Sequence, residues 1–338
     1  RKKIIQITRY GTVLIAFMQS VGVAIFLASY PATPTGPVVP NPGFAFYFVA
    51  ILTLVTGTVF VMWLGERITE YGIGNGISLI IMVGILAQAP HVFNNQIRYF
   101  QEGVITGTKT IILLLIMFVI TLFVVAISTG IRKIPVQYAK RVVGRKVYGG
   151  QATHIPLRIL TAGVMPIIFA QALMFIPNTI SSFFSDGNVF GDWMKTVFAP
   201  THAVYSIVFA VLIVVFTYFY TAITFNPVDI ADNMKKQGGF IPGVRPGKAT
   251  SDYIDHVLTR ITLPASFFLA FIAIFPTFLS NIYEVDYSLA SFYGGTSLLI
   301  IVGVALDTLQ QIESQLIMRH YDGFLKNSKI KGRASRRY

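Results

Sequence analysis

The chain has 338 residues, of which 54% are hydrophobic and 12% charged, and its formal net charge is +13. Its mean hydropathy of +0.65 argues against a water-soluble globular protein, which would have to bury almost every helix on all sides. The chain has no cysteine, so no disulfide can link its loops. The high mean hydropathy and the small share of charged residues together indicate a membrane protein.

Eight apolar stretches follow one another along the chain, each close to the roughly 20 residues that a helix needs to cross the hydrocarbon layer. Seven have no ionisable residue in their interior, whereas the last contains Asp307 and Glu313. We predict transmembrane helices over residues 11–30, 44–64, 77–93, 110–129, 157–178, 203–223, 261–280 and 294–318. The predicted fold class is therefore all-α, a polytopic transmembrane helical bundle.

The basic residues are distributed unevenly between the loops. When the loops are assigned alternately to the two sides of the membrane, all of the 27 Lys and Arg except Arg98, Lys109 and Lys195 fall on one side. Cytoplasmic loops carry an excess of Lys and Arg, so this basic side is predicted to be cytoplasmic. Eight spans return the chain to the side on which it began, and both ends are basic. We therefore predict that both ends of this chain are cytoplasmic.

The loop of residues 130–156 is longer than topology alone requires. Apolar side chains alternate with polar ones at Ile134, Val136 and Tyr138, and this period of two predicts a β-hairpin with Arg145 near its tip. The basic residues of the loop could serve only to set the topology. Connections of this size that project from compact domains usually have a function or are disordered, and the turn residues argue against disorder.

The loop of residues 224–260 has a different composition. A short polar helix is predicted from Asp229 to Lys236, followed by a segment dense in Gly and Pro that surrounds Arg245. Such turn formers hold the backbone in a defined path, so Arg245 is predicted to stand at the end of a stiff projection. Together the two loops are predicted to form a docking surface for a cytoplasmic partner.

The sequence carries no HExxH, GxSxG or GxxxxGK[ST] motif, and its five histidines lie in loops, so neither an enzyme nor a metal site is predicted. Asp307 and Glu313 could mark an ion pathway, although a wet vestibule wall explains them equally well. Two classes of protein stay open: an ion-coupled secondary transporter of a small solute, and a channel whose specificity lies in a cytoplasmic partner. Nearly charge-free spans and large basic loops favour the channel.

Seven motifs, in order along the chain, resemble those of the SecY family, the central pore subunit of the bacterial Sec protein-translocation channel. They occupy residues 63–78, 138–146, 162–170, 225–227, 231–236, 241–247 and 294–300. The resemblance implies a SecY-type channel in which the first span here is the family's third. The family's first two spans and its plug helix are therefore expected to lie outside this chain.

The resemblance also divides the chain into segments. It implies family spans three to six in residues 1–129, the basic hairpin in 130–156, spans seven and eight in 157–223, the docking loop in 224–260, spans nine and ten in 261–318, and a basic tail in 319–338. The implied function is passive conduction of unfolded polypeptides across the bacterial inner membrane, with sideways release of apolar segments into the lipid.

Site residues follow from the same resemblance. It assigns the pore ring, or waist, to Ile77, Ile81, Ile168 and Ile300. It assigns docking of the motor ATPase SecA or of a ribosome to Lys140, Arg141, Arg145, Lys146, Arg245 and Lys248. It assigns the lateral gate to Gln19 and Pro166, with Leu160 where many relatives carry Asn. Aliphatic side chains suit a waist because they offer no hydrogen bond that would hold a passing peptide.

The implied partners are SecE-type and SecG-type small membrane subunits, SecA, the phosphates of ribosomal RNA, signal peptides, nascent chains and the lipid bilayer. No cofactor and no metal is implied. Energy for transport is expected to come from the cytoplasmic partner, because the chain itself carries no nucleotide-binding motif.

Overall fold

The computed structural model describes residues 2–30, 37–138, 141–143, 146–148, 152–182, 184 and 188–327. Its helices are α1 (Lys2–Ala28), α2 (Phe44–Tyr71), α3 (Gly76–Gln101), α4 (Gly107–Thr129), α5 (Met165–Ser182), α6 (Val189–Val197), α7 (Ala203–Thr224), α8 (Pro227–Lys236), α9 (Lys248–Tyr283), α10 (Tyr287–Gly294) and α11 (Thr296–Asn327). Its strands are β1 (Ile131–Tyr138), β2 (Arg141–Val143), β3 (Lys146–Tyr148), β4 (Ala152–Arg158) and β5 (Gly239–Phe240).

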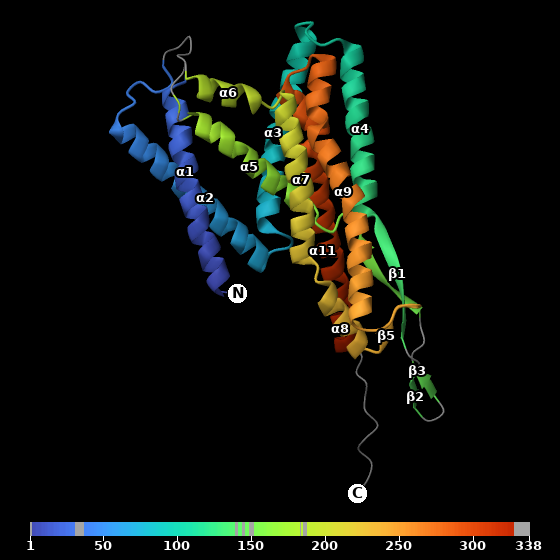
Figure 1. The fold of residues 1–338 in the computed structure, drawn as a ribbon. Coiled ribbons are helices and arrows are strands. Elements are labelled where there is room, and N and C mark those ends of the chain that lie inside the picture. The colour runs from blue at the N-terminus through green and yellow to red at the C-terminus, as the bar shows by residue number, and fades with distance from the viewer. Residues whose placement is uncertain are drawn as a thin grey trace.

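Long helices dominate the molecule (Figure 1). Among the described residues, seven helices are long and apolar enough to cross a membrane. The fifth predicted span, 157–178, is the exception, because helix α5 begins only at Met165. Residues 157–158 instead complete strand β4, and a turn occupies residues 159–164. Helix α5 has 18 residues and at 1.5 Å per residue is about 27 Å long, close to the thickness of the hydrocarbon layer.

The main core lies where α5, α7, α9 and α11 meet, and α4 contributes Val124 to it. Small side chains such as Ala170, Ala265 and Ala273 are buried there, and small residues let membrane helices approach closely. Helices α1 and α2 pack on each other and stand to one side of this bundle, joined to it through α5 and α3 (Figure 1). The core is therefore concentrated in the second half of the chain.

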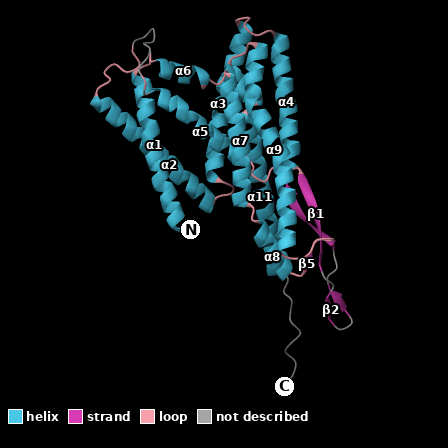
Figure 2. Cartoon of the chain, viewed as in Figure 1, coloured by secondary structure: helices cyan, strands magenta, loops and turns pink. Residues whose placement is uncertain are grey.

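Strands gather at one end of the bundle (Figure 2). Strand β1 pairs antiparallel with β4, from Ile131↔Arg158 to Gln137↔Ala152. Its last two residues also pair with β5, in the register Gln137↔Phe240 and Tyr138↔Gly239. Strands β1 and β4 thus pair as the alternation predicts, and the sheet extends beyond them to a strand from the other long loop.

The two loops also share an apolar core that lies apart from the membrane bundle. Its buried side chains are Ile134, Val136, Leu157, Met234, Ile241 and Ile254. We call the body formed by β1, β4, β5, α8 and the first turns of α9 the platform. Helix α8 begins at Pro227, earlier than the predicted Asp229, because the side chain of Asn226 accepts a hydrogen bond from the backbone N–H of Val228 and caps the helix.

Candidate functional site

The four isoleucines predicted for the waist come from three helices. Ile77 and Ile81 lie in the first two turns of α3, Ile168 in the first turn of α5 and Ile300 in the second turn of α11. Ile300 is buried in the main core, and Ile81 and Ile168 are half-buried against the same core. Ile77 lies outside this cluster and is 49% exposed. The structure thus gathers three of the four; their convergence on one pore axis stays a prediction.

A tight turn fixes the start of α3 and with it Ile77. The side-chain oxygen of Asn75 accepts hydrogen bonds from two backbone N–H groups of the first helical turn, at 3.1 and 3.3 Å. The hydroxyl of Thr69 accepts a third from the N–H of Gly76, at 2.8 Å. A Cβ at Gly76 would lie 2.1 Å from the carbonyl oxygen of Gly65. Only glycine permits this approach, which explains the glycine-rich motif at the turn.

Arg245 is held by its backbone while its side chain stays exposed. Its carbonyl oxygen accepts a hydrogen bond of 2.9 Å from the hydroxyl of Thr250, which is 2% exposed. The neighbouring Val244 packs against the platform core, and Gly247 adopts a φ of +102° that favours glycine. Arg245 is exposed and forms no ion pair within the described part of the chain. The guanidinium is therefore available to a partner.

The other predicted docking cations are described to different extents. Lys248 is exposed at the first residue of α9, close to Arg245 in the sequence. Arg141 and Lys146 belong to the small hairpin of β2 and β3, where Arg141 pairs with Tyr148 and Lys146 with Val143. Lys140 and Arg145 lie outside the described residues.

The predicted gate residues lie on two helices that contact each other, α1 and α5. Gln19 is half-buried in α1. Pro166 is the second residue of α5, where its missing N–H removes no helical hydrogen bond, so it lies at the start of the helix and does not interrupt it. Pro177 is the proline inside α5. Leu160 is buried in the main core, so this position adds apolar packing rather than a polar group.

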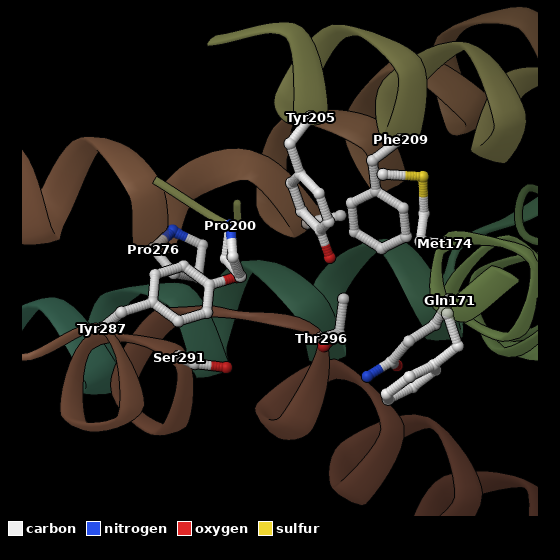
Figure 3. Close-up of a pocket in the computed structure, with 11 residues that line it drawn as sticks. Gln171, Met174, Pro200, Tyr205, Phe209, Pro276, Tyr287, Ser291 and Thr296 are labelled. Atoms are coloured by element: carbon white, nitrogen blue, oxygen red, sulfur yellow. The ribbon is translucent and has the colours of Figure 1, made fainter. Parts of the chain in front are cut away.

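A recess of about 200 Å³ is lined by side chains of α5, α7, α9, α10 and α11 (Figure 3). Gln171 lies one turn after Ile168 on α5, and Thr296 lies one turn before Ile300 on α11. The side chains of Tyr205 and Ser291 also point into this space (Figure 3). Polar groups on apolar walls make the recess suited to water, and no local pattern in the sequence predicts it.

The two carboxylates of the last span have separate surroundings. Asp307 accepts a hydrogen bond of 3.1 Å from the guanidinium of Arg158, and the two form an ion pair. Glu313 is exposed, further along α11. Since Asp307 already pairs with an arginine of this chain, it differs from the unpaired carboxylate that an ion-coupled transporter would present to its ion.

Comparison with known proteins identifies the family. The SecY family model matches residues 1–309. This chain belongs to the SecY family. The protein translocase subunit SecY of Escherichia coli K12 is 44% identical over 335 residues, which are 98% of this chain and 74% of that protein. Its counterpart in Halalkalibacterium halodurans is 46% identical over 332 residues, which are 96% of this chain and 76% of that protein.

Two solved structures have the same fold. One concerns the plug domain of a SecY protein and the closed state of its translocation channel; it has a TM-score of 0.63 and 18% identity, covering 94% of this chain and 75% of that one. The other, of a protein-conducting channel, has a TM-score of 0.63 and 18% identity, covering 90% of this chain and 71% of that one. The predicted fold class is thereby confirmed: the chain is a multi-pass membrane protein with a SecY-type helical fold.

Within this SecY-type fold, the contacts that join segments distant in the chain were not predicted from the sequence. Arg158 was counted only among the basic residues that set topology, yet its partner Asp307 lies 149 residues away. The pairing of β1 with β5 likewise joins two loops about 100 residues apart. The only available signal was that Arg158 and Asp307 both lie in the cytoplasmic halves of their predicted spans, 157–178 and 294–318.

Proposed function

We propose that this chain conducts unfolded polypeptides through a bacterial inner membrane as the pore subunit of a Sec-type translocase, and that it releases apolar segments sideways into the lipid. The observation that carries this proposal is the match to the SecY family over residues 1–309. The relatives named above are protein translocase subunits, and their similarity to this chain extends over 98% and 96% of its length. An ion-coupled transporter is not favoured.

The waist supports conduction because its side chains are aliphatic. Ile81, Ile168 and Ile300 meet one apolar core, on α3, α5 and α11. Such side chains can close around a peptide without hydrogen-bonding to it, and they restrict ions by steric exclusion and dewetting. We assign Ile77 to the same ring at its platform side, one turn of α3 before Ile81.

The platform supports docking because it is ordered and carries exposed cations. Arg245 and Lys248 stand at its surface, and a guanidinium fork binds carboxylates and phosphates equally well. We assign these residues, with Lys140, Arg141, Arg145 and Lys146, to the binding of a SecA-type motor or a ribosome. SecE-type and SecG-type small subunits, signal peptides and nascent chains complete the proposed set of partners.

The distribution of Lys and Arg supports a cytoplasmic position for the platform and for both ends of this chain. The absence of cysteine makes a direct test simple, since single cysteines at Lys235, on α8, and at Lys195, on α6, would be the only thiols. In intact cells an impermeant thiol reagent should label the Lys195→Cys chain and spare the Lys235→Cys chain. The opposite pattern of labelling would reverse the orientation.

Reconstitution tests the function itself. Vesicles that hold this chain with its small subunits should take up an unfolded secretory precursor, in the presence of SecA and ATP, into a protease-protected form. Replacing Ile168 and Ile300 together by Ser should raise the ion leak, because the seal is apolar and steric. The matched control, Ile111→Ser on the exposed surface of α4, should leave the leak unchanged. Uptake of a small solute coupled to an ion gradient, without precursor uptake, would contradict the proposal.

A further inference from the structure

Arg158 joins the platform to the helix that carries Ile300. It is the last residue of β4, and its Nη1 donates a hydrogen bond of 3.1 Å to the Oδ1 of Asp307 on α11. Its Nη2 donates to the Oε1 of Gln310 on the same helix. One planar guanidinium group therefore binds two side chains at once. The ammonium group of a lysine would hold them in a less defined geometry, because it lacks the planar arrangement of donors. Asp307 lies seven residues after Ile300, two turns along nearly the same face of α11.

A second contact lies one helical turn away and is apolar. A Cβ at Gly303 would lie 2.4 Å from the Cγ1 of Val164, so α11 touches the turn of residues 159–164 without any side chain between them. Gly163 in the same turn has a φ of +58°, and a Cβ there would lie 3.6 Å from the Oδ2 of Asp307. The turn is thus held on α11 by an apolar contact at Gly303 and an ion pair at Asp307.

The turn of residues 159–164 is also the direct chain link from strand β4 of the platform to α5. At its start the N–H of Ile159 donates a hydrogen bond of 2.9 Å to the carbonyl oxygen of Gly130, at the end of α4. At its other end α5 begins and carries Ile168 within its first turn. A displacement of the platform can therefore reach Ile168 through this turn and Ile300 through the contact of Arg158 with α11.

We propose that the ion pair of Arg158 with Asp307 is a clasp that keeps the platform end of α5 against the middle of α11 and so favours the closed waist. This inference rests on the proposed function. Arg158 is a positioning residue, because it acts on the waist through its contacts with α11. The two side chains are 47% and 48% exposed, and exposed ion pairs are weak. A partner that moves the platform can therefore release the clasp reversibly.

The clasp can be tested by ion conductance of the assembled complex in planar bilayers, without precursor. Arg158→Gln and Asp307→Asn should each raise the resting leak by up to about fivefold, which is the population shift expected from losing one exposed ion pair. The charge-swapped double variant, Arg158→Asp with Asp307→Arg, should return the leak towards the parent value. Arg158→Lys should give an intermediate leak, because it keeps the charge but lacks the fork.

The chain offers a matched control in a second exposed ion pair, between Arg9 of α1 and Glu66 of α2 at 2.7 Å, whose side chains are 52% and 32% exposed. Arg9→Gln removes a comparable pair away from α11 and should leave the leak unchanged. An unchanged leak in both Arg158→Gln and Asp307→Asn would overturn the clasp. So would a leak in the Arg9→Gln control that rises as much as in these variants, or a charge-swapped double variant that leaks as much as either single variant. Precursor uptake is measured in parallel. If the proposed function is wrong, neither the parent complex nor any variant takes up precursor; if only the clasp is wrong, the parent complex still does.

Discussion

The platform and the membrane bundle are packed by different means. The platform core is built from large side chains such as Ile134 and Ile254, and the strand that supplies Ile134 exposes Lys133 and Gln137 on its other face. The bundle core includes buried alanines and the direct approach of Gly303 to Val164. Water drives large apolar side chains together, whereas lipid tails are as apolar as those side chains, so membrane helices depend on close fit. The two regions should therefore respond to different substitutions.

The largest effect is expected in the platform. Ile254→Ala removes a side chain that is 1% exposed and should lower the stability of the platform by about 2–5 kcal/mol, because it loses burial and leaves a cavity. Hydrogen exchange of the α8 and β5 amides in nanodiscs measures this. Leu263→Ala, on the same helix but 50% exposed, is the control and should change exchange little. Equal protection in the two variants would contradict the difference in packing.

The next effect concerns binding rather than stability. Arg245→Glu should weaken binding of the platform's partner by about 1.5–3 kcal/mol, the value of one charge-assisted hydrogen bond, while platform stability stays unchanged. Affinity for SecA in reconstituted vesicles measures it, with hydrogen exchange of the platform in parallel. Arg132→Glu, an exposed cation on β1, is the charge-matched control and should weaken binding less. Equal losses in both variants would mean that the partner senses only the net charge of the platform.

The sequence predicted those features that have a local cause. Hydropathy located the long helices, the alternation at Ile134 and Val136 predicted the hairpin, and the short polar helix was predicted from Asp229, two residues after its observed start. The start of α5 was predicted too early because an apolar residue such as Leu157 fits a membrane span and a buried strand equally well. Leu157 is buried in the platform core, and this burial depends on tertiary contacts that the local sequence does not show.

The candidate site was predictable only in part, for the same reason. The waist isoleucines came from motif resemblance, since isoleucine in an apolar span carries no signal of its own. The pairing of Arg158 with Asp307 depends on two segments 149 residues apart, and neither segment specifies the other. The turn before α3 is the intermediate case: its glycines are visible in the sequence, but the reason for them is the approach of Gly76 to Gly65.

The smallest effect is expected in the bundle and tests close fit directly. Gly303→Ala adds one methyl group that would lie 2.4 Å from the Cγ1 of Val164 and should lower the stability of the bundle by about 1–3 kcal/mol through overpacking. Thermal unfolding in nanodiscs measures this. Gly84→Ala, in α3, is the control: a Cβ there meets nothing within 4 Å, so the variant should be stabilised by about 0.5–1 kcal/mol through helix propensity. Adding Val164→Ala to Gly303→Ala should recover part of the loss, because it removes the methyl group that is struck. If Gly303→Ala and Gly84→Ala behaved alike, close helix contact would not be what holds this part of the bundle.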